Sequence, residues 1–390
     1  MEIKNIYGFR RDQGDLGIRN YIVIMPSVIC ANEVAKRISY QVENSIVLPH
    51  TGGCGTYGGD IEKTFQTLVG LGQNPNVAAL LIVGLGCETV NANDLVLGIL
   101  KESPGKIIEK VIIQEEKGTS NAITRGVLIA SEMARKVSTF KRSEGSIEDI
   151  TFALECGGSD PTSGLAANPV LGYVTEKIIS LGGRVILSET RELIGAEHIL
   201  AKNAINKEVA KKLLEVVYNI ENKCNTWIAG TNQRLMSAGN IRGGLTTIEE
   251  KALGCINKVG NAKVSEVVQY AQKPREKGLI VMDTTGHDIP SMTGMVAGGA
   301  QLVGFTTGKG NTVGYALAPV IKITGNPDTF MNMRENIDID ASTIITGKES
   351  IEEVGERLFN EIIEVCNGKL TKAESFGFKD FALSTMAGAF

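Results

Sequence analysis

Short apolar runs alternate with amphipathic stretches along the first 140 residues of the chain. Four of these runs have the length and side chains of buried strands, and they lie at residues 21–26, 45–48, 77–83 and 106–114. Apolar residues at helical spacing predict helices over residues 32–41, 61–71 and 120–137. Regular alternation of strand and helix indicates a parallel, doubly wound sheet.

A charged segment without periodicity, residues 141–148, is expected to be a linker. Five later apolar runs are expected to be strands, at residues 151–154, 184–187, 279–282, 301–305 and 319–323. A mostly helical stretch around residues 196–271 separates the second of them from the third. The pattern therefore predicts an α/β fold with two Rossmann-like parallel-sheet domains, residues 1–145 and 146–390, the second with a helical insertion.

Three strand ends lead into glycine-flanked loops that each carry one cysteine: Cys54, Cys87 and Cys156. Ligands of open α/β sheets bind at the carboxyl ends of strands, so these thiols are candidate metal ligands. Thiolates favour Fe²⁺, Zn²⁺ or an iron–sulfur cluster, whereas the C-x-x-C spacing of structural zinc sites is absent. The spacing allows both a single metal ion and a cluster with one open iron. The other cysteines lie in helical patterns and are expected to be small hydrophobic residues: Cys30, Cys224, Cys255 and Cys366.

The chain has only three histidines, so each is informative. His50 shares a loop with Cys54 and is a candidate ligand or base, and His287 follows the polar strand end Asp-Thr-Thr-Gly. His198 lies in a helical run, where a solvent-facing histidine is expected. The glycine-rich loops at 52–60 and 306–310 fit neither common nucleotide-binding pattern, so we do not expect a nucleotide.

Composition restricts the class of protein further. The 390 residues are 43% apolar and 22% charged, with a net charge of −4 and no basic block, so a nucleic-acid partner is not expected. No run of about 18 apolar residues predicts a membrane span, and the first residues do not have the pattern of a secretory leader. Seven cysteines in such a chain are expected to be reduced thiols in the cytoplasm.

Taken together, the loops resemble the altronate/galactarate dehydratase family of hydro-lyases, in its large catalytic region. The matching stretches span nearly the whole chain, at residues 14–20, 50–55, 86–88, 155–164, 167–169, 189–192, 195–197, 239–240, 243–251, 282–286, 291, 293–294, 297–299 and 305–310. Fused members of the family carry a further small domain of the SAF type, which is not found here. The resemblance therefore implies a separate small SAF-domain subunit as partner.

The resemblance implies a metal-dependent hydro-lyase that removes water from a sugar acid and leaves a 2-keto-3-deoxy acid. It implies Fe²⁺ as cofactor, with Mn²⁺ or an iron–sulfur cluster as alternatives. The related sulfolactate sulfo-lyases eliminate sulfite instead of water, so a C–S lyase is the first alternative. A subunit that binds a sugar acid without turning it over, and a cysteine-based acyl- or redox-transfer enzyme, are the others. A homo-oligomer is also compatible with the sequence.

The implied reaction assigns roles to the polar residues at the strand ends. The expected metal ligands are the following: Cys54, Cys87, Cys156 and Glu155. Proton transfer and charge pairing are expected from a second set: His50, His287, Glu88 and Lys251. A third set is expected to bind the hydroxyl groups and carboxylate of the substrate: Arg19, Ser159, Asp160, Asn240, Thr306 and Thr307.

Overall fold

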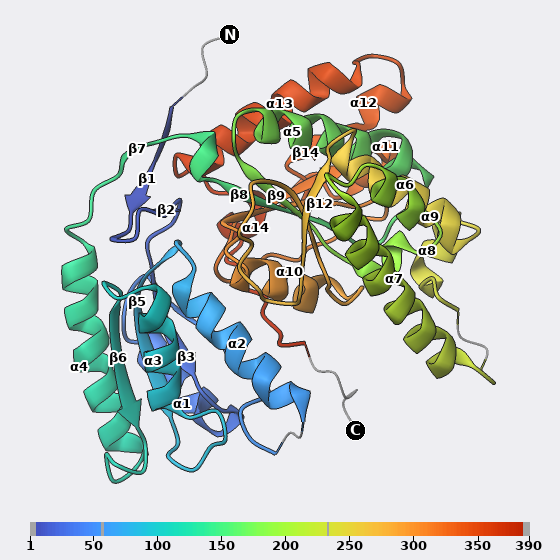
Figure 1. The fold of residues 1–390 in the computed structure, drawn as a ribbon. Coiled ribbons are helices and arrows are strands. Elements are labelled where there is room, and N and C mark those ends of the chain that lie inside the picture. The colour runs from blue at the N-terminus through green and yellow to red at the C-terminus, as the bar shows by residue number, and fades with distance from the viewer. Residues whose placement is uncertain (1–4, 56–57, 232–233, 385–390) are drawn as a thin grey trace.

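A computed structural model describes residues 5–55, 58–231 and 234–384. Figure 1 shows a smaller α/β unit, formed by the first part of the chain, beside a larger one. Across the described ranges, no helix is both long enough and apolar enough to cross a membrane.

The smaller unit is built on a four-stranded parallel sheet in the order β4-β3-β5-β6. Its strands are β3 (Tyr21–Pro26), β4 (Ser45–Val47), β5 (Val77–Gly84) and β6 (Ile107–Ile112). Every residue of β5 is buried, as expected of a central parallel strand covered on both faces. The covering helices lie in pairs on the two faces: α1 (Asn32–Ser39) with α4 (Thr119–Val137), and α2 (Gly59–Gln73) with α3 (Ala92–Glu102). The strands and helices predicted for this part of the chain are confirmed.

The larger unit is built on a seven-stranded parallel sheet in the order β10-β11-β9-β8-β12-β13-β14. Its strands are β8 (Thr151–Cys156), β9 (Arg184–Leu187), β10 (Val264–Val268), β11 (Gly278–Met282), β12 (Leu302–Thr306), β13 (Val320–Thr324) and β14 (Ile339–Asp340). The five predicted strands are all present. Two strands, β14 and β10, were not predicted. β10 lies within the stretch expected to be helical and forms one edge of the sheet.

A third, small antiparallel sheet joins distant parts of the chain. It consists of β1 (Ile6–Arg10), β2 (Leu16–Gly17) and β7 (Ser143–Gly145). The pairing of Ile6 with Gly145 brings the start of the chain against the segment expected to be a linker, so that segment is in part a strand.

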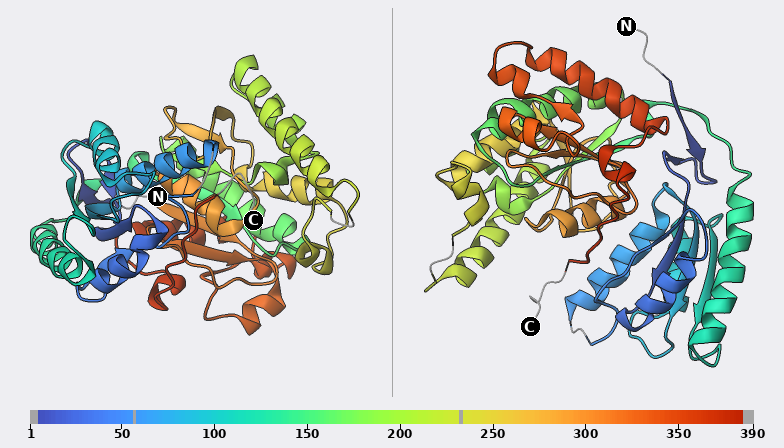
Figure 2. Two further views of the ribbon diagram at one scale, coloured as in Figure 1. Left: turned by 90° about the horizontal axis from the view of Figure 1, so that it is seen from below. Right: turned by 180° about the vertical axis from the view of Figure 1, so that it is seen from behind.

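Helices surround the larger sheet on both faces, and α7 projects from the body of the molecule (Figure 2). The helices of this unit are α5 (Asn168–Ser180), α6 (Glu197–Lys202), α7 (Lys207–Ile228), α8 (Ala238–Arg242), α9 (Ile248–Ile256), α10 (Asp288–Ala297), α11 (Pro327–Asn332), α12 (Ser342–Ile345), α13 (Ile351–Cys366) and α14 (Lys372–Ser375). Short turns of other helix types include a π-helical turn, η3 (Ser163–Ala167), and a 3₁₀ turn, η4 (Thr190–Leu193).

The two units pack against each other through α2 and α10. A single hydrophobic cluster contains strand residues of both sheets, such as Leu80 and Ala153, together with residues of these two helices. At the crossing, a Cβ atom on Gly70 would lie only 2.4 Å from the backbone oxygen of Ala297. Glycine at this position therefore allows the helices to approach closely.

Candidate functional site

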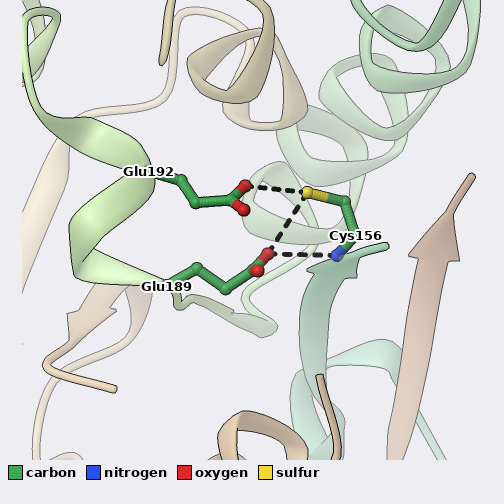
Figure 3. A group of neighbouring side chains, drawn as sticks. All are labelled: Cys156, Glu189 and Glu192. Atoms are coloured by element: carbon green, nitrogen blue, oxygen red, sulfur yellow. Dashed lines mark hydrogen bonds between the residues drawn. The ribbon is translucent and has the colours of Figure 1, made fainter. Parts of the chain in front are cut away.

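The thiol of Cys156 and two carboxylates form a compact group at the carboxyl end of the larger sheet (Figure 3). Cys156 is the last residue of β8. Glu189 immediately precedes η4, the turn that follows β9, and Glu192 lies within it. The Cys156 Sγ atom is 3.2 Å from Glu189 Oε2 and 3.0 Å from Glu192 Oε2. The backbone N–H of Cys156 also donates to Glu189 Oε2, at 3.1 Å. Adjacent parallel strands thus bring residues 33 and 36 positions apart into direct contact.

Two buried lysines accompany these carboxylates. Lys258 Nζ lies 3.4 Å from Glu189 Oε2, and both side chains are inaccessible to solvent. Lys251 Nζ contacts Glu192 Oε1, and this pair is also buried. Burial of charges is costly unless they are paired, so the two lysines are needed to keep carboxylates ionised here.

Further carboxylates extend the group beyond Glu189. One oxygen each of Glu155, Glu189 and Asp288 lie within 4.8 Å of one another, so Glu189 belongs to both clusters. Glu155 is fully buried and accepts a hydrogen bond from Ser188 at 3.2 Å. Asp288 is half-buried and accepts one from Asn311 at 3.1 Å. In the part of the chain that the structure describes, Glu189 Oε1 is buried without any hydrogen-bond donor.

The backbone at Glu189 adopts the left-handed conformation, with φ 60° and ψ 57°. This conformation is uncommon for residues other than glycine, asparagine and aspartate, and it must be held by its surroundings. The Glu189 N–H donates to Thr284 Oγ1 at 2.7 Å, and the Thr284 N–H donates to Thr190 Oγ1 at 3.2 Å. Thr190 in turn donates to Asp283 at 2.8 Å. The loop after β11 therefore fixes the direction in which the Glu189 carboxylate points.

The environment shifts the pKa values of the group in different directions. Burial, followed by the neighbouring Glu189, raises the pKa of Glu155 well above its ordinary value. A hydrogen bond with Cys255 and burial likewise raise the pKa of Cys156. Burial alone would raise the pKa of Glu192, but Lys251 and Lys258 outweigh it and lower that pKa. Without a cation, these shifts favour the protonated forms of Glu155 and the Cys156 thiol and the ionised form of Glu192.

A cavity of about 490 Å³ opens beside the group and is lined by Cys156, Glu192 and Lys251. Its polar floor also includes Ser159 and Asp160 from the loop after β8. Its outer wall is apolar and includes two exposed leucines, Leu165 and Leu253. The two segments that carry these leucines approach closely, because a Cβ atom on Gly164 would lie only 3.2 Å from the Cα of Gly254.

Several of the residues predicted to bind substrate lie at or next to this cavity. Asp160 accepts hydrogen bonds from Thr162 at 2.6 Å and from Asn326 at 2.8 Å, which fixes its carboxylate within the loop. Thr306 is fully buried and donates to Asn168, a residue of the cavity wall, at 2.7 Å.

Two further predicted binding residues, Thr307 and Asn240, lie away from the cavity lining. The Thr307 hydroxyl accepts from the Gly310 N–H at 3.0 Å, inside its own turn. Asn240 is buried in the first turns of α8. Neither lines the cavity.

The structure does not bring Cys54 and Cys87 to Cys156. Both are exposed in loops that follow the smaller sheet, whereas Cys156 is buried at the end of a strand of the larger one. Their two loops contact each other, because the Thr89 and Val90 N–H groups both donate to the Gly53 carbonyl. Within the described ranges, neither thiol belongs to a group of three potential metal ligands. The prediction that the three cysteines surround one metal therefore has no support from the geometry.

His50 and Glu88 are both engaged in holding loops of the smaller unit. One ring nitrogen of His50, Nε2, is 2.7 Å from the Pro26 carbonyl, and the other accepts from the Gly52 N–H at 3.2 Å. Burial lowers the pKa of His50, which keeps the ring neutral. Glu88 accepts from Ser27 at 2.7 Å and from the Gly86 N–H at 2.6 Å. These contacts leave His50 no free nitrogen for the predicted acid–base role.

Arg19 also differs from its predicted role as a substrate-binding residue. Its guanidinium makes two hydrogen bonds of 2.8 Å to Glu374 and donates to the carbonyls of Val365 and Lys369. It thereby ties the first segment of the chain to the last one. Of the histidines, His287 is exposed and precedes Asp288 at the start of α10, so its ring is open to solvent.

Four residues of the group were not predicted as site residues from the sequence: Glu189, Glu192, Lys258 and Asp288. A signal for the two glutamates was present, because residues 189–192 follow a predicted strand and carry two acidic side chains. Lys258 lies just beyond α9, in the stretch expected to be an insertion, and it has no local signal of this kind.

Comparison with protein-family models gives matches over most of the chain. Residues 8–138 match the model described as D-galactarate dehydratase/Altronate hydrolase, second domain. Residues 147–388 match the model described as D-galactarate/Altronate dehydratase, C-terminal.

Individual relatives give the same picture. The chain is 34% identical over 390 residues to the (2R)-sulfolactate sulfo-lyase subunit beta of Chromohalobacter salexigens, with 99% of each chain covered. It is 32% identical over 396 residues to the altronate dehydratase of Bacillus subtilis, and this match covers 98% of this chain and 78% of the relative. It is 33% identical over 382 residues to the galactarate dehydratase (L-threo-forming) of Escherichia coli, and this match covers 93% of this chain and 72% of the relative.

Proposed function

This chain belongs to the D-galactarate/altronate dehydratase family, and from that premise we propose that it is a metal-dependent hydro-lyase. Its substrate is a sugar acid of the altronate or galactarate type, and its product is a 2-keto-3-deoxy acid. The family expected from the sequence is confirmed, and so is the lyase class, because the relatives are all lyases by name.

One observation carries the metal dependence, namely a buried donor set of one sulfur and two carboxylates. Cys156, Glu189 and Glu192 offer these atoms within 4.8 Å of one another, and Cys156 and Glu192 line the cavity. A divalent cation fits this set, because these are metal-ligating groups and the cation would offset their excess negative charge.

The donor types indicate which metals suit the group. A mixture of thiolate and carboxylate suits Fe²⁺, with Mn²⁺ as the harder alternative. An iron–sulfur cluster is ligated by three or four cysteines, and the group contains only Cys156. When bound, the cation would act as a Lewis acid on the substrate carboxylate and 2-hydroxyl and stabilise the enediolate charge.

The residues around the cavity position the substrate. The Lys251 ammonium contacts Glu192 through one of its three donors, so it can still donate to a substrate carboxylate. Ser159 and Asp160 border the same space with groups that suit sugar hydroxyls. The apolar outer wall helps to exclude water from the reacting atoms. His287 remains the candidate for proton transfer, since both nitrogens of His50 are engaged.

A C–S elimination is the alternative that one observation favours. The relative covered over 99% of both chains is named as a sulfo-lyase subunit. Both reactions begin with removal of a proton next to a carboxylate, so the same cavity floor suits either one. The difference lies in the leaving group, which is hydroxide in one case and sulfite in the other.

We also propose that a second, smaller polypeptide acts with this chain. The support is that a relative of equal length is named subunit beta, while two other relatives extend beyond the matched region. Leu165 is 66% exposed and Leu253 is 49% exposed at the mouth of the cavity, where an apolar partner surface would fit. Native mass spectrometry of the chain isolated from its own source tests this proposal. A complex of this 41.7 kDa chain with a second, lighter polypeptide supports it. If the observed masses are all multiples of 41.7 kDa, the chain forms a homo-oligomer instead.

Turnover and binding assays test the proposed reaction. Anaerobically purified protein supplied with Fe²⁺ is incubated with altronate, galactarate or sulfolactate, and the release of 2-keto acid and of sulfite is measured. We expect 2-keto acid from a sugar acid, loss of activity in Cys156→Ser, and unchanged activity in Cys30→Ser, whose thiol is exposed in another part of the fold. Sulfite release would favour the C–S lyase. Binding of a sugar acid by calorimetry without any product, even with the small partner present, would indicate a non-catalytic subunit.

A further inference from the structure

We propose that Glu155, Glu189 and Asp288 hold a second divalent cation beside the first, with Glu189 as the bridging carboxylate. The inference rests on the proposed function, because it presumes a cation at Cys156, Glu189 and Glu192. It adds a position with three carboxylate ligands and no sulfur.

The two donor sets have one side chain in common. The first set and the second set each have their ligand atoms within 4.8 Å of one another, and Glu189 is the member that they share. Carboxylates commonly bridge cation pairs that are about 3.5–4 Å apart. The left-handed backbone at Glu189 and its hydrogen bond to Thr284 hold the carboxylate in this shared place.

The unsatisfied oxygen is an independent observation that indicates a ligand. Glu189 Oε2 accepts from Cys156 and lies next to Lys258, whereas Oε1 has no donor among the residues described. Glu189 is fully buried, so water does not complete its hydrogen bonding from bulk solvent. An unsatisfied buried polar atom costs about 1–3 kcal/mol, more when charged, so Oε1 requires either a shared proton or a cation.

The balance of charge favours the cation over the proton once substrate is bound. Cation binding displaces the protons of Glu155 and Cys156. In that fully ionised state, four carboxylates and one thiolate, set against the two lysines, leave three negative charges. One divalent cation leaves a net negative charge that would repel an anionic substrate. Two leave a single positive charge, which the substrate carboxylate neutralises.

Neighbouring donors orient the second set for a hard cation. Ser188 donates to Glu155 Oε2, the Cys156 N–H donates to Glu155 Oε1 at 3.3 Å, and Asn311 donates to Asp288 Oδ2, so both carboxylates are held in place. Such outer contacts are typical of metal ligands. Three carboxylates suit Mn²⁺ or Mg²⁺ better than a soft metal. Asp288 is half-buried and follows the exposed His287, so an ion reaches this position from the solvent side of the loop.

Equilibrium dialysis of the metal-free full chain against Mn²⁺, with bound metal counted by mass spectrometry and by electron paramagnetic resonance, tests the inference. We expect two Mn²⁺ per chain with an exchange-coupled spectrum. Asp288→Asn should bind one Mn²⁺ and lose the coupling, while Asp94→Asn, an exposed aspartate on α3, should match the wild type. Equal melting temperatures in chelator would show that Asp288→Asn is folded.

The outcomes separate the two proposals. One Mn²⁺ in the wild type, unchanged in Asp288→Asn, overturns the second position and leaves the proposed function in place. Two Mn²⁺ that persist in Asp288→Asn overturn the assignment to these ligands. A wild type that binds no Mn²⁺ overturns both the second position and the metal dependence.

Discussion

Lys258 Nζ lies 3.4 Å from Glu189 Oε2, and neither side chain reaches solvent. Burial by itself lowers the pKa of Lys258, but Cys156, Cys255 and Glu189 outweigh it and hold that pKa well above its ordinary value. Lys258 therefore stays protonated and offsets part of the negative charge of the neighbouring acidic group.

Replacement of Lys258 by methionine should destabilise the protein. Removing one partner of a buried ion pair leaves an uncompensated charge, at a cost of about 3–5 kcal/mol in the free energy of unfolding. Urea denaturation of Lys258→Met in the presence of chelator measures this cost. Lys101→Met, at an exposed position on α3, should change stability by less than about 0.5 kcal/mol. A loss as small as that of the control would mean that the group does not need Lys258.

Arg19 should act as a structural tether. Its bonds to Glu374 and to two carbonyls of the last helical region are buried, so Arg19→Met should lower the free energy of unfolding by about 3 kcal/mol. Once folded, the variant should keep KM within about twofold of the wild type, because no substrate contact is lost. Arg357→Met, which removes a surface pair with Glu349, is the matched control and should be nearly neutral. A large rise in KM with unchanged stability would instead restore the substrate-binding role.

The contact between α2 and α10 should be intolerant of a methyl group. In Gly70→Ala the new Cβ would lie 2.4 Å from the Ala297 carbonyl, so the helices must move apart. We expect a loss of about 1–3 kcal/mol, measured by calorimetry. Gly239→Ala in α8 is the control, because its new Cβ would lie 3.8 Å from its nearest neighbour, Ser237 Oγ, and it should be neutral or slightly stabilising. Equal melting temperatures for the two variants would mean that the units do not depend on this contact.

Lys322 should make stability rise with pH above neutrality. It is fully buried, its Nζ donates to the Val313 carbonyl at 2.7 Å, and burial lowers its pKa to about 8. Between pH 8 and about 10.5 the unfolded chain keeps a proton that the folded chain has released, so this group stabilises the fold as pH rises. The full effect is about 3 kcal/mol. Urea titrations across this range should show a less positive slope for Lys322→Met than for the wild type, and identical slopes would contradict the argument.

Much of the fold could be predicted because local pattern determines it. A strand such as β5, with every residue apolar, and the amphipathic helix α4 are evident in the sequence. The strand β10 was missed because it is a short edge strand with two polar, partly exposed residues, Ser265 and Glu266, within a stretch of helical pattern. The pairing of β1 with β7 joins residues about 140 positions apart, and no local signal predicts it.

The site was predicted only where a strand end revealed it. Cys156 and Glu155 were found because they end a buried strand. Glu189 and Glu192 join them only because β9 lies beside β8, and strand order is not visible in the sequence. Cys54 and Cys87 also lie in loops that follow strands, but these strands belong to the other sheet, and sequence alone does not show which strand ends converge.

Spectroscopy of the Co²⁺-substituted protein tests most directly whether Cys156 binds the metal. A thiolate bound to Co²⁺ produces a ligand-to-metal charge-transfer band in the near ultraviolet, and its intensity reports the number of sulfur ligands. We predict a band of one-thiolate intensity in the wild type, in Cys54→Ser and in Cys87→Ser, and its absence in Cys156→Ser. A band that persists in Cys156→Ser, or that is lost in Cys54→Ser or Cys87→Ser, would contradict the assignment of the metal to the group at Cys156, Glu189 and Glu192.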